Sequence, residues 1–174
     1  LTGHLVFSTL HTNDAPGALS RMLDMGIEPF LVTSTVTGVL AQRLVRALCT
    51  ACCAPYDPTP ADLAALHVAD ASALHPPLMK SVGCEACSGI GFKGRTGIYE
   101  LLVMTDGLRP LVLERASVSD IRAKAHAEGM RTLRQDGVAK ALAGVTTVEE
   151  IIRETQDYEE YRRGMSDFGL SIAD

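Results

Sequence analysis

Hydrophobic residues near the start of the chain form a short continuous run, followed by a set at helical spacing. Residues 4–10 (HLVFSTL) are apolar and partly β-branched, which is typical of a strand inside a parallel sheet. Asn13 and Asp14 then supply capping side chains, and Pro16 suits a first helical turn. The pattern therefore predicts a strand and then a helix that ends at Gly26.

A second helix and a second strand are predicted to follow directly. Pro29 suits the first turn of this helix, and the strand covers residues 42–48 (QRLVRAL). The helix should carry a broad apolar face, made of Phe30, Val32, Val36, Val39 and Leu40. Because strands and helices alternate, the predicted fold class is α/β.

The rest of the chain is predicted to return to the sheet and then to become helical. Residues 97–103 form a strand that pairs with 42–48, so the segment between them is an insertion at the tip of a two-stranded hairpin. Helix starts follow at pairs with capping-box spacing or its Asp variant: Ser117 and Asp120, Thr132 and Gln135, Thr147 and Glu150. Four short helices are expected to form a small C-terminal bundle.

Two Cys-x-x-Cys pairs lie in the insertion, Cys49 with Cys52 and Cys84 with Cys87. Two tight turns that each deliver two thiolates predict a closed tetrahedral site, with zinc as the metal. A set of disulfides is the alternative. The odd number of cysteines, the absence of a signal peptide at the start and a chain long enough to build a core all favour the metal in a reducing cytosol.

Other residues of the insertion leave the ligand set open. Cys53 directly follows Cys52, so a grip through Cys49 and Cys53 is an alternative to the predicted Cys52. His67 and His75 also lie between the two pairs, and each is able in principle to replace a sulfur. We assign both histidines to the surface, because four thiolates at matched spacing already complete the site.

Composition and charge exclude some classes of protein. The chain has 174 residues, is 47% hydrophobic and carries a net charge of −5. No run of 18 apolar residues occurs, so a soluble globular protein without membrane insertion is expected. The negative charge argues against nucleic acid as a partner, because phosphate binding usually needs a basic face.

The end of the first predicted strand is the place where chemistry is expected. Ligands of α/β sheets bind beyond the carboxyl ends of the strands, where loops present polar groups. His11, Thr12, Asn13 and Asp14 follow that strand. His4 lies at its opposite end, and an extended run of this length separates the two histidines by roughly 20 Å. His11 is therefore the better candidate for a functional side chain.

Four stretches of the chain, in this order, resemble signatures of the secretion ATPase superfamily, and most closely the type II secretion and type IV pilus assembly ATPases (GspE/PilB). The resemblance runs from Leu1 to about Thr155, and its pairing of a histidine box with a tetracysteine insertion is specific. The stretches are TGHLVFSTLHTNDAPGALSRMLDMGIEPF, AQRLVRALCTAC, GCEACSGIGFKGRTGIYELLVMTD and GMRTLRQDGVAKALAGVTTVEEIIRET.

The resemblance implies the C-terminal part of a RecA-like P-loop ATPase core with an inserted tetracysteine zinc subdomain and a C-terminal helical bundle. The implied parts are core at 1–48, zinc insertion at 49–93, a returning core strand at 94–105 and a helical subdomain with a tail at 106–174. No G-x-x-x-x-G-K-[ST] loop occurs in the sequence. This part alone is therefore expected to be inactive, because the Walker A and Walker B regions would lie upstream.

The resemblance also implies a function: a cytoplasmic homohexamer that is peripheral to the inner membrane and hydrolyses ATP with Mg²⁺. It would drive pseudopilus assembly for type II secretion, or type IV pilus extension as the alternative, together with inner-membrane platform proteins. A zinc-stabilised interaction module without a nucleotide role is the alternative of another class. Residues beyond Thr155, with Tyr158, Tyr161 and Phe168, are expected to be a solvated tail or, alternatively, to pack on another protein.

Specific residues match the family motifs by position. His4 and His11 match the two histidines of the histidine box, and His11 would lie nearer the nucleotide, where it senses the γ-phosphate or the attacking water. Thr9 and Thr12 are weaker candidates for contact with the same nucleotide. Cys49, Cys52, Cys84 and Cys87 match the tetracysteine motif, with structural Zn²⁺.

Overall fold

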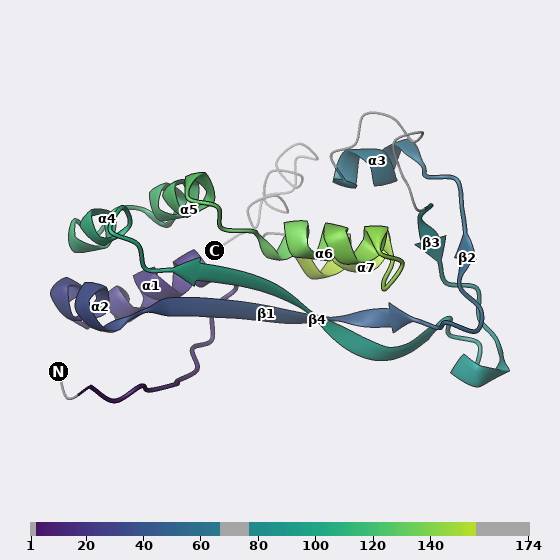
Figure 1. The fold of residues 1–174 in the computed structure, drawn as a ribbon, viewed down its shortest axis with the longest axis horizontal. Coiled ribbons are helices and arrows are strands. Elements are labelled where there is room, and N and C mark those ends of the chain that lie inside the picture. Colours follow the sequence, from purple (N-terminus) through teal and green to yellow (C-terminus); the bar gives the residue numbers. More distant parts are fainter. Residues whose placement is uncertain (1–2, 67–76, 156–174) are drawn as a thin grey trace, which may run out of the picture. The chain divides into compact units, whose positions relative to one another are not determined.

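A computed structural model describes residues 3–66 and 77–155. Figure 1 shows the order of helices and strands along the chain. The elements are α1 (Ala15–Asp24), α2 (Pro29–Thr35), β1 (Gly38–Leu48), β2 (Ala54–Pro55), α3 (Pro60–Leu66), β3 (Met79–Lys80), the 3-10 turn η2 (Glu85–Cys87), β4 (Phe92–Val103), α4 (Arg109–Leu113), α5 (Val118–Ala127), α6 (Leu133–Leu142) and α7 (Val148–Thr155). The fold thus mixes helix and strand, as predicted.

The chain divides into two compact units. The first comprises Leu1–Arg43 and Gly97–Asp136, and the second comprises Leu44–Thr96 and Gly137–Asp174. Within the described ranges, no helix has both the length and the hydropathy that crossing a membrane requires.

The predicted hairpin is present and longer than expected. β1 and β4 are hydrogen-bonded neighbours in a two-stranded sheet, and Figure 1 shows them side by side. At one end the Met104 N–H donates to the Thr37 carbonyl at 3.0 Å, and at the other the Cys49 N–H donates to the Gly91 carbonyl at 3.0 Å. Since residue numbers rise along one strand while they fall along the other, the strands are antiparallel. The cysteine segment connects them.

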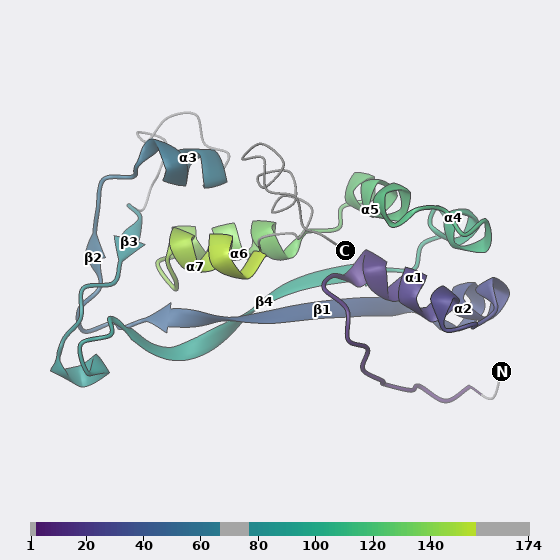
Figure 2. The ribbon, with the colours of Figure 1, turned by 180° about the vertical axis from the view of Figure 1, so that it is seen from behind.

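In the first unit, α1 packs against α2 and α5, and α2 also packs against α4. Figure 2 shows α1 and α2 together beside the start of β1. Inward-facing residues of β4 alternate with exposed ones, so one face of the strand meets these helices. The buried cluster consists of Ala15, Leu19, Leu23, Val32, Leu102, Met104, Leu108, Val112, Ile121, Ala125 and Met130.

Helix α1 begins and ends as the sequence predicted. The Asp14 carboxylate caps it by accepting from the Gly17 N–H at 2.8 Å, and Pro16 lies in the first turn. Gly26, just beyond its end, has φ +85°, which glycine adopts without strain. The capping prediction is therefore confirmed at Asp14.

The boundary between α2 and β1 was predicted too late. Val36 is the C-cap of α2, and β1 already begins at Gly38, so Val39 and Leu40 belong to the strand. Apolar β-branched residues suit either element, and periodicity alone does not separate them. Gly38 permits the early start, because a Cβ there would lie 2.9 Å from the Leu102 carbonyl oxygen on β4.

The first predicted strand is wrong for the chain as it stands. Residues 3–12 have no regular secondary structure, and residues 3–11 are exposed, including Leu5, Val6 and Phe7. A strand is stable only when neighbouring strands satisfy its backbone hydrogen bonds. Among the described residues, β1 and β4 pair with each other and β2 with β3, so none pairs with this run.

The second unit contains a small antiparallel ladder and a pair of helices. β2 pairs with β3, with Ala54 opposite Lys80, and α3 packs against α7.

The Thr132–Gln135 capping box is confirmed in both directions. All four helices predicted after residue 105 form, but α4 and α5 pack with α1 and α2, so the C-terminal bundle is not confirmed.

Candidate metal centre and nucleotide-side residues

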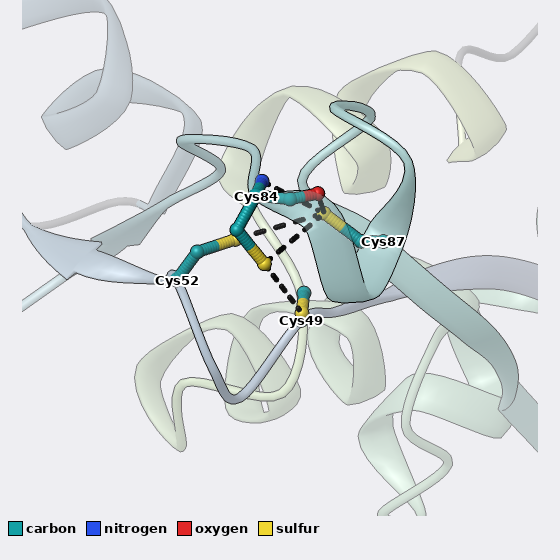
Figure 3. A group of neighbouring side chains, drawn as sticks. All are labelled: Cys49, Cys52, Cys84 and Cys87. Carbon is teal, nitrogen blue, oxygen red and sulfur yellow. Dashed lines mark hydrogen bonds between the residues drawn. The ribbon is translucent and has the colours of Figure 1, made fainter.

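Four sulfurs gather at the tip of the hairpin, where β1 ends and β4 begins (Figure 3). Cys49 and Cys52 follow β1, while Cys84 and Cys87 precede β4, and their four Sγ atoms all lie within 4.8 Å of one another. The Sγ atoms of Cys52 and Cys87 lie 3.8 Å apart, as do those of Cys84 and Cys87, and the Sγ atoms of Cys49 and Cys84 lie 4.0 Å apart. Sulfurs at the corners of a tetrahedron with metal bonds of about 2.3 Å are about 3.8 Å apart. The cluster therefore has the dimensions of a four-thiolate site.

Two tight turns aim these sulfurs. The Cys52 N–H donates to the Cys49 carbonyl at 3.1 Å, and the Cys87 N–H donates to the Cys84 carbonyl at 3.2 Å. Gly83 and Gly89, which flank the second turn, have φ +102° and +79°. Glycine adopts these positive φ values without strain, and they let the chain curl back on itself around the sulfurs.

Backbone N–H groups point at two of the sulfurs. Gly83 donates to Cys52 Sγ at 3.3 Å, while Cys84 and Gly91 each donate to Cys87 Sγ at 3.2 Å. Such bonds stabilise a thiolate, and metal ligands commonly carry them. Chiefly through the Cys84 N–H, the pKa of the Cys87 thiol is lowered to about 6. Burial raises the pKa of Cys52 to about 12. A cation at the centre would therefore be needed to hold all four as thiolates.

The structure separates the two adjacent cysteines. Cys52 belongs to the cluster, whereas Cys53 is a free thiol outside it whose N–H donates to the Cys49 carbonyl at 2.9 Å. All five cysteines are free thiols, so no disulfide joins any two of them. His67 and His75, together with the tail that carries Tyr158, Tyr161 and Phe168, lie outside the described residues.

The histidines of the predicted nucleotide site lie in the exposed segment before α1. His4 and His11 are both exposed, as is Thr9. Thr12 is half-buried, and its hydroxyl donates to the Asp14 carbonyl at 3.1 Å. The histidines belong to the first unit and the four cysteines to the second, so the two candidate sites fall in separate parts of the chain.

The start of α1, just after His11, is held by groups that the sequence did not indicate. The Glu100 carboxylate on β4 accepts from the Ala15 N–H at 2.9 Å, and Arg122 on α5 forms an ion pair with Asp14 at 2.5 Å. Burial raises the pKa of Glu100 above its ordinary value, although the Ala15 N–H opposes the shift. A usable signal existed, since Glu100 is the one charged residue in the predicted strand 97–103 (GIYELLV).

The outer face of β4 lines a cavity of about 370 Å³ in the first unit. Leu101, Val103 and Met130 contribute apolar walls, and Glu128 and Asp136 lie at its polar side. Neither predicted histidine lines it. The cavity is therefore distinct from the segment that carries the two histidines.

Comparison with known proteins gives one consistent result. Residues 1–153 match the protein family described as type II/IV secretion system protein. Type II secretion system protein E of Pseudomonas aeruginosa is 51% identical over 157 residues, which cover 90% of this chain and 31% of that protein. The type IV pilus assembly ATPase PilB of Thermus thermophilus is 46% identical over 155 residues, covering 89% of this chain and 17% of that protein.

A further relative, the type II secretion system ATPase E of Vibrio cholerae, is 45% identical over 162 residues, covering 90% of this chain and 31% of that protein. The chain thus spans less than a third of the length of these relatives.

Proposed function

Because the chain belongs to the type II/IV secretion system protein family, we propose that it is the C-terminal portion of a hexameric motor ATPase that drives protein secretion through a type II system. The match over residues 1–153 carries this proposal. Relatives named as ATPases cover about nine tenths of the chain. In this proposal the RecA-like core is completed by residues upstream of Leu1.

Extension of a type IV pilus is the second candidate function. It is supported by the pilus assembly ATPase PilB of Thermus thermophilus, whose identity of 46% is close to the 51% of the secretion relative. In either case the motor would work at the cytoplasmic side of the inner membrane against platform proteins. Deleting the gene separates the two: loss of enzyme secretion with pili intact supports the first, and loss of pili with secretion intact supports the second.

ATP is the proposed substrate, and Mg²⁺ would neutralise its phosphate charge. His11 would donate a hydrogen bond to the γ-phosphate or to the attacking water, with Thr9 and Thr12 nearby and His4 at the far end of the same segment. The proposal draws support from the position of His11 three residues before Asp14, at the capped start of α1. Movement of the segment on hydrolysis would reach α1 directly.

The test is ATP turnover by the complete gene product that carries this chain. His11→Ala should lower kcat by about 100-fold, the typical cost of one lost donor to developing charge, and should change KM less than threefold. The matched control is His126→Ala, which alters a half-buried histidine on α5 and should keep the wild-type rate. Equal rates in wild type and His11→Ala would remove His11 from the mechanism, and a gene product without ATPase activity would refute the motor.

Zinc is the proposed occupant of the four-cysteine cluster. Four sulfurs leave no open position for a substrate, so the metal would be structural. Elemental analysis of protein purified without added metal should find about one zinc per chain. Cys84→Ser should lose it, and Cys53→Ser, which alters a thiol outside the cluster, should retain it. Folded protein without metal would refute this assignment.

A further inference from the structure

One buried carboxylate binds the first backbone amides of two helices. Glu100 lies on β4 and is only 4% exposed. Its Oε1 accepts from the N–H of Ala15, the first residue of α1, at 2.9 Å, and its Oε2 accepts from the N–H of Leu133, the first residue of α6, at 3.3 Å. All three residues belong to the first unit. The two helix starts are therefore tied to one side chain.

Burying an acidic side chain costs free energy unless hydrogen bonds or positive charge compensate it. Ile98 and Leu102, the inward neighbours of Glu100 on β4, are fully buried, and an apolar residue would suit the site. The cost is partly offset by two amides that have no acceptor within their own helices, and by the positive ends of those two helices. Two oxygens are needed for two amides. Glutamine has only one acceptor oxygen, so it can satisfy one helix and not the other.

The contact at Ala15 bears on the segment that holds His11. Asp14 caps α1 through Gly17 and pairs with Arg122, and the Thr12 hydroxyl donates to the Asp14 carbonyl. Glu100 holds the next residue, Ala15. The last residues between His11 and α1 are thus anchored to β4 and α5, and any displacement of the α1 start moves the point from which His11 extends.

We propose that Glu100 is a positioning residue that sets the place of His11 by holding the start of α1, and that ties this place to the start of α6 through its second oxygen. The inference rests on the role proposed for His11. It adds a route by which a change at the nucleotide reaches the C-terminal helices, because the same carboxylate binds the N-termini of α1 and α6.

The first test measures kcat and KM for ATP in the complete gene product. Glu100→Gln should lower kcat by about 10- to 100-fold, the range expected for misplacing a catalytic group, and should change KM less than threefold. The matched control is Glu150→Gln. Glu150 is equally buried, at 2% exposed, but binds Arg46 in the second unit. At a temperature where both variants are folded, Glu150→Gln should keep its kcat.

A double variant separates positioning from a general structural role. If Glu100 acts through His11, then Glu100→Gln combined with His11→Ala should be no slower than His11→Ala alone. Multiplied losses would overturn the inference. Normal kcat in Glu100→Gln beside slow His11→Ala would overturn the inference and leave the proposed function standing. Normal kcat in His11→Ala would overturn the proposed role of His11 itself.

A second pair of variants removes one donor and leaves the carboxylate unchanged. Leu133→Pro deletes the N–H at the first helical position, where proline is tolerated, and Leu133→Ala loses the side chain but keeps the N–H. The proline variant should turn over ATP at least about threefold more slowly than the alanine variant. Equal rates would overturn the coupling to α6. Hydrogen exchange at Ala15 and Leu133 should also accelerate in Glu100→Gln, and unchanged exchange at both would overturn the contact.

Discussion

The Glu150 carboxylate binds Arg46 at two points: it accepts a hydrogen bond from the Arg46 backbone N–H and forms an ion pair with the Arg46 guanidinium. Arg46 lies on β1 and Glu150 on α7, so this side chain joins a strand to a helix 104 residues away. Arg153 adds a second cation at 2.8 Å, and the Arg46 guanidinium lies 4.1 Å from the centre of the Phe92 ring. Glu150 and Arg46 together therefore link α7, β1 and β4.

Replacing Glu150 with glutamine should destabilise the second unit by about 2 kcal/mol, because charged hydrogen bonds to a buried group are lost. Half-exposed Arg46 can turn to water, which limits the cost. Urea unfolding followed by circular dichroism measures the change. Glu149→Gln, an exposed neighbour on α7, is the control and should stay within about 0.5 kcal/mol of wild type. Equal stability of both variants would contradict the role of the pair.

Gly83→Ala should disrupt the second cysteine turn. The new Cβ would lie 2.5 Å from the Gly89 carbonyl oxygen, and φ +102° is unfavourable for alanine. We expect weaker metal retention and a loss of about 2 kcal/mol or more, measured by zinc competition with a chelator and by thermal unfolding. Gly94→Ala has φ +80° but open space around its Cβ, so it should cost about 1 kcal/mol and keep the metal. Metal loss in both variants would show that the positive φ alone, without the clash at Gly83, determines whether the metal is retained.

Removing metal should loosen the second unit selectively. A zinc chelator should accelerate hydrogen exchange at the amides that point at the sulfurs, those of Gly83, Cys84 and Gly91, because their acceptors then move apart. Amides of the first unit, such as Ala15, should keep their protection. The chelator should have no effect on Cys84→Ser protein. Identical exchange with and without chelator would indicate that the cysteines hold the turn unaided.

The two buried glutamates should respond to pH with opposite signs. Burial raises the pKa of Glu100, despite the Ala15 and Leu133 amides and the charge of Arg122, and the nearby Asp14 adds to the rise. The folded state thus binds this proton more tightly than the unfolded state, so its contribution is full below the unfolded value near 4.5 and is lost as pH rises through the folded pKa.

For Glu150, burial raises the pKa, but the side-chain and backbone bonds from Arg46 outweigh it and the net shift is downward. Its contribution is present above 4.5 and is lost as pH falls below that value. Thermal unfolding measured between pH 3 and pH 7 should therefore lose the alkaline-side decline in Glu100→Gln and the acid-side decline in Glu150→Gln. Profiles unchanged by either substitution would contradict these assignments.

Local patterns predicted what local chemistry determines. Asp14 and Gly26 bounded α1 correctly, and the two strands of the hairpin followed from their apolar runs. The strand at 4–10 failed because a strand needs a partner, which pattern alone does not supply. Glu100 was missed for a related reason. The two amides that donate to its carboxylate, those of Ala15 and Leu133, lie 85 and 33 residues away in the chain, and only the folded structure brings them to it.

Once the two cysteine turns are closed, the register between β1 and β4 should no longer depend on the length of the loop that joins them. With metal bound, the ends of the 31-residue stretch between Cys52 and Cys84 are fixed by four sulfurs, so the pairing of β1 with β4 should depend little on the length of that stretch. Doubling the length of such a loop costs only about 0.6 kcal/mol in closure entropy. A label inserted between β2 and β3 is therefore expected to leave the pairing of β1 with β4 unchanged.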